Sequence, residues 1–567
     1  MSSLRISRPG RLAACTALAL SAGMLLSGTA AADETPKAPH TAVKPAGPEL
    51  TARPSLTLPH HAKRSAAAAA TPLKPRLDVD KDGSGDLLYR AINGKAYVET
   101  ATQELEFATN TFGPYKDLIT PGDLDGDGSS ELLTVSPTGT LSLYAGVSTG
   151  GASYPNWTGQ GWNAYNKLFA PGDVNGDGKY DLLARTPSGD LYLYLGNGSA
   201  TGDPFASKVK VGGGWQAYDQ LVGANDMNGD GIGDVVARTP GGDLYFYAGT
   251  GNAAAPLKTR VRIGGGWDAY NQIVPLDDVN NDGLADIATR GPGGKLYLYL
   301  ADGKGNFKDR IVGGDGWNVS VVFASQGGNT TWGKSDLMGR DSKGTLFYYY
   351  ALNNGTLSAR KQVSSDGGWL GAHMGYAASL DADSDPELFE VYQNNLYADT
   401  TYISGGWGGY NLVVGPGDLN NDGKGDLLTR DDSGTLWLQR GNGQGTGFAS
   451  RLKVGGGWNA YNQIVGAGDL TGDGLADIVA RTGDGKLYLY QGTGVSTSPF
   501  KSRVYVGPGW QQFRNIAAPG DLNGDGRADL IATNSRGEAF RYDANGYGGF
   551  KSRVKLGDGW NTYRDLY

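Results

Sequence analysis

The feature that most constrains this chain is an acidic motif that occurs ten times. Its pattern is Asp-x-[Asp/Asn]-x-Asp-Gly-x-x-[Asp/Glu]. The ten copies, called loops 1 to 10, begin at residues 78, 123, 173, 226, 278, 328, 379, 418, 469 and 521. A recurrence near every 50 residues indicates a repeat architecture rather than one large core. The chain has 567 residues with 92 glycines, and its 39% hydrophobic content is enough to build a folded core.

The unit around each loop predicts short strands and no helix. In the ninth unit, Ile478–Ala480 is β-branched and apolar, Gly483–Gly485 is a turn, and Lys486–Tyr490 alternates with a period of two. Ser502–Val506 is a further strand, and Gly509–Trp510 opens the next unit. Four short strands repeated radially form a β-propeller blade, so the sequence predicts an all-β propeller of ten four-stranded repeats.

The two ends of the repeat region fit together. The first unit starts at Lys74–Leu77 without a Gly-Trp opening strand, and the last residues, Gly559–Tyr567, form an opening strand with no loop after it. We expect the last strand to complete the first blade, which removes an exposed sheet edge. Two arrangements stay open: two five-bladed rings over 75–316 and 317–567, or one ring of ten blades.

The N-terminus predicts export. Residues 1–32 combine three arginines, an apolar run and a small-residue end, which is typical of a secretory signal peptide. Residues 33–74 are rich in Pro and Ala and predict a flexible linker, with His40, His60 and His61 solvated. Cys15 is the only cysteine, so the mature chain is expected to be secreted, extracellular and free of disulfides. No other apolar run approaches the length of a membrane span.

The loops have the chemistry of calcium sites. Ca²⁺ takes six to eight oxygen ligands, and side chains at loop positions 1, 3 and 5, a backbone carbonyl at 7 and a carboxylate at 9 supply them. Eight loops are complete, which predicts about eight Ca²⁺. The predicted ligands are Asp78, Asp80, Asp82, Asp86; Asp123, Asp125, Asp127, Glu131; Asp173, Asn175, Asp177, Asp181; Asp226, Asn228, Asp230, Asp234; Asp278, Asn280, Asp282, Asp286; Asp418, Asn420, Asp422, Asp426; Asp469, Thr471, Asp473, Asp477; and Asp521, Asn523, Asp525, Asp529.

Two loops depart from the pattern. Loop 7 has Ser379 at position 1 and Ser384 in place of glycine, so whether it binds calcium stays open. Loop 6 has lost its ligands at positions 1, 3 and 5 and is expected to be empty. EF-hands are excluded, because they need a glutamate at position 12 and flanking helices, whereas loop 3 has Ala184 there and a strand follows.

At these loops the chain resembles the FG-GAP/VCBS repeats, which are built like the integrin α-subunit propeller. The resemblance covers residues 75–567 and is clearest at Pro171–Gly178 and the Gly-Gly-Gly-Trp-x-x-Tyr openings, which are similar to the actinobacterial secreted form of the repeat. It implies calcium-stabilised propellers and often adhesion or carbohydrate binding. We therefore expect a non-catalytic module that binds a glycan or cell-surface ligand, with an extracellular polysaccharide-acting enzyme as the alternative. The sequence leaves the oligomeric state open.

Residues 328–335 match the P-loop pattern Gly-x-x-x-x-Gly-Lys-Ser. Nucleotide binding by such a loop needs a helix directly after it, so that backbone N–H groups at its N-terminus cradle the phosphates. The match coincides residue for residue with loop 6, and Asp336–Met338 continues as a strand pattern. We interpret it as a coincidence, and no basic patch predicts nucleic-acid binding.

Aromatic and arginine residues recur in phase with the loops. The aromatic residues either pack between blades or stack on a ligand. The arginines either form inter-blade salt bridges or bind a ligand. The tryptophans are Trp162, Trp215, Trp267, Trp317, Trp369, Trp407, Trp458, Trp510 and Trp560; the tyrosines are Tyr165, Tyr218, Tyr270, Tyr410, Tyr461 and Tyr563; the arginines are Arg185, Arg238, Arg290, Arg340, Arg430 and Arg481. His373 is the only histidine of the repeats, and nothing near it in sequence marks a catalytic triad.

Overall fold

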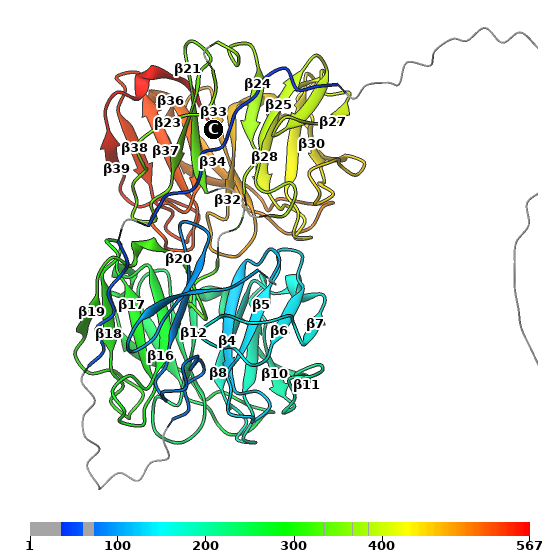
Figure 1. The fold of residues 1–567 in the computed structure, drawn as a ribbon. Helices are drawn as coiled ribbons and strands as arrows, with labels where there is room; N and C mark the ends of the chain where they lie inside the picture. Colours follow the sequence, from blue (N-terminus) through cyan, green and yellow to red (C-terminus); the bar gives the residue numbers. More distant parts are fainter. Residues whose placement is uncertain are drawn as a thin grey trace, which may run out of the picture. The chain divides into compact units, whose positions relative to one another are not determined.

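A computed structural model describes residues 36–50, 52–59, 73–110, 112–330, 332, 335–365, 367–383 and 385–567. Residues Lys37–Tyr567 form one compact unit. Within the described residues, the strands form ten four-stranded antiparallel sheets, which confirms the predicted all-β fold of repeated blades (Figure 1). The predicted signal peptide, Cys15, His60 and His61 lie outside the described residues.

Five sheets form what we call the first blade group. In the order of hydrogen-bonded neighbours they are β20 (Ser320–Phe323), β1 (Leu87–Ala91), β2 (Ala96–Glu99), β3 (Glu104–Phe107); β4 (Asp117–Gly122), β5 (Glu131–Val135), β6 (Leu141–Tyr144), β7 (Trp157–Gly159); β8 (Lys167–Gly172), β9 (Asp181–Arg185), β10 (Leu191–Gly196), β11 (Phe205–Gly212); β12 (Gln220–Asn225), β13 (Asp234–Arg238), β14 (Leu244–Tyr247), β15 (Val261–Gly264); and β16 (Gln272–Asp277), β17 (Asp286–Arg290), β18 (Leu296–Tyr299), β19 (Ile311–Gly314).

The other five sheets form the second blade group. They are β40 (Tyr563–Leu566), β21 (Asp336–Asp341), β22 (Leu346–Tyr350), β23 (Lys361–Gln362); β24 (His373–Tyr376), β25 (Leu388–Tyr392), β26 (Asn395–Ala398), β27 (Thr401–Gly405); β28 (Tyr410–Gly417), β29 (Asp426–Asp431), β30 (Leu436–Gln439), β31 (Leu452–Gly455); β32 (Tyr461–Gly468), β33 (Asp477–Thr482), β34 (Leu487–Tyr490), β35 (Val504–Gly507); and β36 (Phe513–Gly520), β37 (Asp529–Asn534), β38 (Ala539–Tyr542), β39 (Val554–Gly557).

In each group, the first sheet is completed by the last strand of that group's own stretch of the chain. A single ring of ten would pair the last strand with β1, but β40 pairs with β21 and β20 pairs with β1. The expectation that the last residues complete the first blade is therefore wrong. The boundary predicted between residues 316 and 317 lies before β20, a strand that belongs to the first group. Trp317 and Phe323 also pack in the same hydrophobic cluster as Leu87 of β1.

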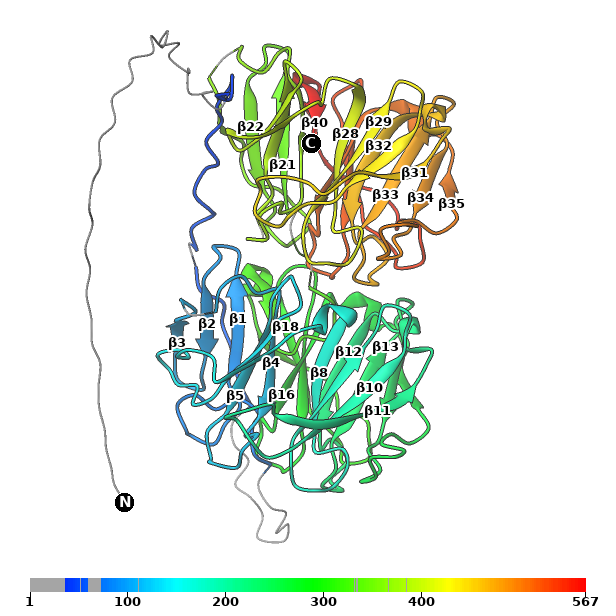
Figure 2. The same ribbon diagram turned by 90° about the vertical axis from the view of Figure 1, so that its right-hand side faces the viewer.

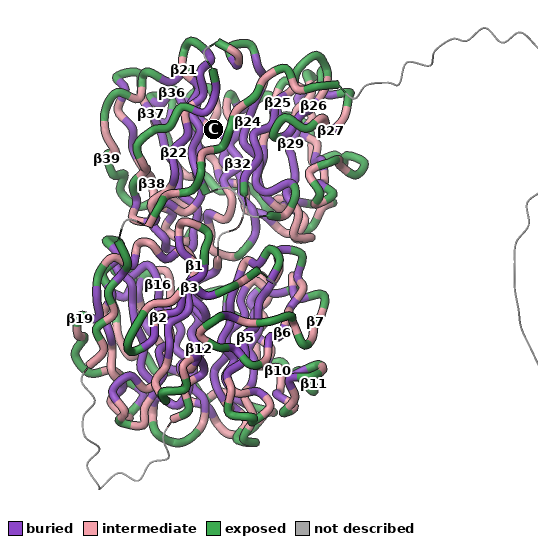
Figure 3. Tube along the Cα trace, in the orientation of Figure 1, coloured by how far each residue is buried: buried purple, intermediate pink, exposed green. Residues whose placement is uncertain are grey.

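Hydrophobic clusters link the sheets of each group in a cycle, because apolar side chains on facing blades bury one another. The buried, purple trace in Figure 3 follows these strands, and the loops between them are largely exposed. Members of one cluster on adjacent sheets are Leu88 with Leu132, Leu133 with Leu182, Leu183 with Val235, Val236 with Ile287, and Ala288 with Leu87 in the first group. In the second they are Met338 with Met374, Phe389 with Leu427, Leu428 with Ile478, Val479 with Leu530, and Ile531 with Leu337.

Seven of the nine Gly-Trp openings form short 3₁₀ turns, which the strand-only prediction missed. The turns are η1 (Trp162–Ala164), η2 (Trp215–Ala217), η3 (Trp267–Ala269), η4 (Trp317–Val319), η5 (Trp458–Ala460), η6 (Trp510–Gln512) and η7 (Trp560–Thr562). The glycine before each tryptophan is left-handed, as at Gly161 with φ 89°, a conformation that costs glycine no steric penalty. The turn places the tryptophan between blades, where Trp162, Trp215 and their equivalents up to Trp510 are buried.

Described parts of the predicted linker contact the blades. Ser55 and Thr57 donate their backbone N–H groups to carbonyls beside β19, at 2.9 and 2.7 Å. The Tyr350 hydroxyl bonds the carbonyl of Ala46 at 2.5 Å, where the dark-blue segment passes β22 in Figure 2. His40 Nδ1 lies 2.5 Å from Glu390 Oε1, so this side chain has a specific partner instead of the predicted solvation.

Candidate metal centre

The complete loops share a backbone fold organised by the first aspartate. In loop 3, Asp173 Oδ1 accepts the N–H of Gly176 at 2.7 Å, and its Oδ2 accepts that of Gly178 at 2.7 Å. Gly176 and Gly178 have φ of 77° and 82°, which explains the glycine at position 6. The backbone N–H groups at positions 4 and 6 are bonded in the same way by Asp226 in loop 4, Asp469 in loop 9 and Asp521 in loop 10. The tight turn brings positions 1, 3 and 5 to one side of the loop.

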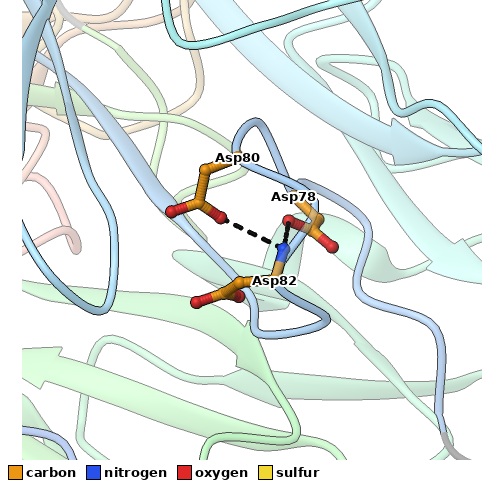
Figure 4. A group of neighbouring side chains, drawn as sticks. All are labelled: Asp78, Asp80 and Asp82. Atoms are coloured by element: carbon orange, nitrogen blue, oxygen red, sulfur yellow. Dashed lines mark hydrogen bonds between the residues drawn. The ribbon is translucent and has the colours of Figure 1, made fainter.

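Carboxylates converge in three of the loops. In loop 1, ligand atoms of Asp78, Asp80 and Asp82 all lie within 4.8 Å of one another. Figure 4 shows these three side chains gathered at the loop. Loop 2 groups Asp123, Asp125 and Asp127 in the same way. The third group is in loop 7, where Asp381, Asp383 and Glu387 come together although position 1 is Ser379. Sequence reasoning left this loop open, and its three retained acids were the available signal.

Several oxygens at predicted ligand positions are buried without a partner. They are Asp86 Oδ1, Asp123 Oδ1, Glu131 Oε1 and Asn523 Oδ1. A buried carboxylate or amide oxygen with no hydrogen bond costs folding free energy, so such atoms are rare in native proteins. A divalent cation with oxygen preference would satisfy them. The predicted ligand set of loops 1, 2 and 10 therefore fits calcium.

The position-9 carboxyls carry raised pKa values. Burial raises the pKa of Asp86 to about 8, and the neighbouring carboxylates of loop 1 add to the shift. Burial likewise raises the pKa of Glu131 to about 8 and of Asp234 to about 7. In loop 8, burial and the charge of Asp418 raise the pKa of Asp426 to about 8. These shifts measure the cost of gathering negative charge away from water, which a bound cation would offset.

Position 9 also ties each loop to its blade. Asp181 Oδ2 accepts the N–H of Val174 at position 2 at 3.1 Å, and its Oδ1 accepts that of Gly196 at 2.9 Å. The same pair of bonds occurs at Asp234, Asp286, Asp426, Asp477 and Asp529. The carboxylate predicted to close the cage is thus also the anchor that fixes the loop on the two central strands of the sheet.

Loop 6 has a different arrangement. Its retained acid, Asp336, accepts the Tyr348 hydroxyl at 2.6 Å and the N–H of Ala351 at 3.0 Å. The P-loop match overlaps this loop, and its Thr331, Gly333 and Lys334 lie outside the described residues. The strand β21 begins at Asp336, so the helix that phosphate binding requires does not follow the match.

The recurrent arginines connect neighbouring blades through backbone carbonyls. Arg238 Nη1 on β13 donates to the carbonyls of Trp267 at 3.0 Å and Tyr270 before β16. The equivalent bonds are made by Arg185, Arg290, Arg340, Arg430 and Arg481. The predicted inter-blade salt bridges are wrong in one respect: the partners across the blades are backbone carbonyls of the Gly-Trp openings and not carboxylates.

A second repeated cluster lies on the outer strands. The hydroxyls of Tyr270 and Tyr299 are 2.6 Å apart, and Arg310 bonds Tyr270 while its guanidinium lies 4.5 Å from the ring centre of Tyr297. Equivalent clusters use Lys208, Arg260 and Arg503. Each cation is exposed and stands seven residues before a recurrent tryptophan. That spacing was visible in the sequence and was missed.

Outside the loops, two acids face each other on neighbouring strands. Glu99 and Glu104 face each other across β2 and β3, and burial together with Glu104 raises the pKa of Glu99 to about 7. Glu104 accepts the Tyr89 hydroxyl and pairs with Arg53 at 3.0 Å. On β24, burial lowers the pKa of His373, and Arg340 acts in the same direction. Among the described residues, no helix has the length and apolar character needed to cross a membrane.

Comparisons with known proteins agree with the repeat pattern. A family model described as FG-GAP-like repeat matches residues 123–184, 173–237, 418–480 and 469–532. A solved Agrocybe aegerita lectin that recognises non-reducing terminal N-acetylglucosamine is 17% identical, over 86% of this chain and 93% of that chain, with a TM-score of 0.22. BBS1N in complex with ARL6DN, soaked with mercury, is 13% identical over 60% of this chain and 82% of that chain, also at 0.22. At these TM-scores neither structure informs the function.

Proposed function

Because this chain contains FG-GAP-like repeats, we propose that it is a calcium-binding β-propeller protein in which loops 1–5 and 8–10 each hold one Ca²⁺. The observation that carries this proposal is the set of buried, unpartnered oxygens at ligand positions, Asp86 Oδ1, Asp123 Oδ1, Glu131 Oε1 and Asn523 Oδ1. Convergence of three carboxylates in loops 1 and 2 supports it.

The ion would supply positive charge where the fold gathers negative charge. Side chains at positions 1, 3 and 5 would hold it, and position 9 would orient the loop through its backbone bonds. Cys15 is the only cysteine, so the chain cannot form an internal disulfide. Loop closure by the metal would take the place of such covalent cross-links. Loop 7 is a weaker ninth candidate, because its serine at position 1 contributes no charge.

Calcium titration tests this directly. The mature chain is stripped with chelator, dialysed and titrated by isothermal calorimetry, with bound calcium counted by elemental analysis. We expect about eight Ca²⁺ per chain, and Asp177→Ala should remove one. Thr330→Ala in loop 6 is the matched control and should leave the count unchanged. A count of two or fewer would contradict the proposal.

We further propose that the surface formed by the outer strands of the blades binds a glycan or another cell-surface ligand without catalysing a reaction. The repeated outer-strand clusters favour this reading: each offers two tyrosine hydroxyls and one exposed cation, groups that suit sugar hydroxyls and carboxylates. The recurrent tryptophans are less suited as stacking platforms because they are buried. The facing acids Glu99 and Glu104 do not favour an enzyme, since Glu104 is already held by Tyr89 and Arg53.

A glycan array with and without calcium tests the ligand proposal. Binding by the wild type should weaken in the double variant Arg260→Ala/Arg310→Ala, which removes two equivalent cations. The control is Arg262→Ala, whose side chain pairs with the exposed Asp243 instead of a tyrosine. Equal binding by all three proteins would place the ligand elsewhere, and turnover of a polysaccharide would favour the enzyme alternative. Export of the chain stays a prediction from residues 1–32.

A further inference from the structure

Loops 8, 9 and 10 of the second blade group are in contact with the first group, and the contacts are made by their backbone carbonyls. Asn163 Nδ2 donates to the carbonyl of Asn421 in loop 8, and Asn421 Nδ2 donates to the carbonyl of Asn163, both at 2.8 Å. Asn166 Nδ2 bonds the carbonyl of Asp473 in loop 9 at 2.6 Å. These asparagines lie on and beside the 3₁₀ turn η1, so one turn of the first group reaches two loops.

Loop 10 is held most extensively. Asn271 donates to the carbonyl of Asn523, while Gln272 Nε2 and Arg290 Nη2 both donate to the carbonyl of Gly524, at 3.2 and 2.6 Å. These acceptors are positions 3 and 4 of the loop. Their orientation depends on the same tight turn that brings the ligand side chains to the opposite side.

A buried ion network adds to the contact at loop 10. Arg527, at position 7 of this loop, pairs with Asp219 of the first group at 2.9 Å and with Asp525 at 3.0 Å. Arg238 also pairs with Asp219 at 2.7 Å. All four side chains are at most 6% exposed, and removing one partner would leave an uncompensated charge away from water.

Cations of the first group lie close to acids of loops 8, 9 and 10. Burial lowers the pKa of Lys116 while Asp418 of loop 8 raises it; burial likewise lowers the pKa of Arg185 and Arg290, against the acids of loops 9 and 10 respectively. Each of these three loops has three carboxylates at ligand positions. One Ca²⁺ would bring the summed charge of the three ligand carboxylates in each loop from −3 to −1, with one cation of the first group opposite each loop.

The loops of the first group have other neighbours. The carbonyl of Asp173 in loop 3 accepts the N–H of Gly233, and that of Asp226 in loop 4 accepts the N–H of Ala285, both within the first group. The position-5 acids of loops 4 and 5, Asp230 and Asp282, pair with exposed lysines of the outer strands. Loops 8 to 10 are therefore set apart by their hydrogen bonds to the first blade group, which the sequence pattern does not reveal.

We propose that Ca²⁺ in loops 8, 9 and 10 orders the surface that holds the first blade group, so that calcium joins the two groups. This inference rests on the proposed calcium binding. Without the ion, three carboxylates in each loop repel one another, the turn opens, and the carbonyls that Asn163, Asn166 and Asn271 bond are no longer presented together. Calcium in loops 1 to 5 stabilises individual blades and does not act on this contact.

Small-angle X-ray scattering of the mature chain tests the joint, with bound calcium counted on the same samples. We expect chelation to increase the radius of gyration of the wild type reversibly. Asp422→Asn/Asp473→Asn, in loops 8 and 9, should lose the calcium-dependent compaction. The matched control is Asp230→Asn/Asp282→Asn, which removes the same position-5 acids from loops 4 and 5. It should lose two ions and keep the compaction.

A third variant separates the contact from metal binding. Asn163→Ala/Asn271→Ala removes hydrogen bonds from the first group without touching a ligand, so it should bind about eight Ca²⁺ and still be expanded in calcium. If the wild type binds no calcium, the proposed function fails. Two outcomes would overturn only the proposal that calcium joins the two groups. One is a wild type that binds eight Ca²⁺ but whose scattering is unchanged by chelation. The other is a control pair that expands as much as the loop 8 and 9 pair. Compact scattering from Asn163→Ala/Asn271→Ala would also overturn it.

Discussion

Removing calcium should make the stability of this protein fall as pH rises, and Asp86 shows why. The pKa of this buried carboxyl is raised from 3.8 to about 8 by desolvation and by the other acids of loop 1. The folded state therefore keeps a proton that the unfolded state releases above pH 4. Its contribution to stability is fully present below about pH 4 and is lost as pH rises through about 8.

The magnitude follows from proton linkage. Between those two pKa values, one such group lowers the free energy of unfolding by about 1.4 kcal/mol for each pH unit. For a cooperative unit of roughly 200 residues, this shifts the melting temperature by about 3 to 5 °C per pH unit. Asp86 is 9% exposed, so solvent screening does not reduce the effect much. In calcium the stability should instead rise with pH. The ligands of Ca²⁺ must be deprotonated, so calcium binding tightens as pH rises.

The assay is thermal unfolding at pH 5, 6, 7 and 8, in EDTA and in millimolar calcium. The melting temperature in EDTA should fall across this range, and the gap between the calcium and EDTA curves should widen. Asp86→Asn cannot ionise, so its melting temperature in EDTA should fall less steeply with pH than that of the wild type, and it should be more stable than the wild type at pH 8 in EDTA. In calcium the order should reverse, because a ligand has been weakened.

Two results would refute this reasoning. One is an EDTA curve that is flat or rises between pH 5 and 8, which would mean that the acids of the loops are not crowded in the folded state. The other is a change of only a degree or two when calcium is chelated, which would remove the structural role of the ion. If Asp86→Asn is less stable than the wild type in both conditions, the orphaned Asp86 Oδ1 is not the source of the effect.

Three further outcomes are expected. In millimolar calcium, Asp473→Ala should lose roughly 1.4 kcal/mol of unfolding free energy for a site with Kd near 0.1 mM, whereas Thr330→Ala in loop 6 should change it little; equal losses would contradict the loop assignment. Lys334→Ala should leave calorimetric ATP titrations unchanged, and saturable binding lost in this variant would restore the P-loop reading. Arg238→Ala breaks a buried pair with Asp219 and should cost about 3–5 kcal/mol in chemical denaturation, more than Arg430→Ala, whose side chain is less buried and bonds an asparagine.

Most of the candidate site followed from the sequence because its geometry is local. Nine consecutive residues define each loop, and an aspartate at position 1 can reach the N–H groups of positions 4 and 6 in any copy. What escaped were features that combine distant segments. The pairing of Arg310 with Tyr270, for example, joins an outer strand to the opening of the same blade, 40 residues earlier in the chain.

The sequence by itself determined the repeat, its four strands and the spacing of acids and glycines in each loop, because alternation and turn residues act over a few residues. Tertiary structure alone decided where the array closes. The strands of residues 320–323 and 563–566 carry similar openings, and either could pair with β1 by local preference. Only packing of whole blades, through clusters such as that of Leu87, Trp317 and Phe323, selects the partner. The same packing places loops 8–10, and not loops 1–5, against the first blade group.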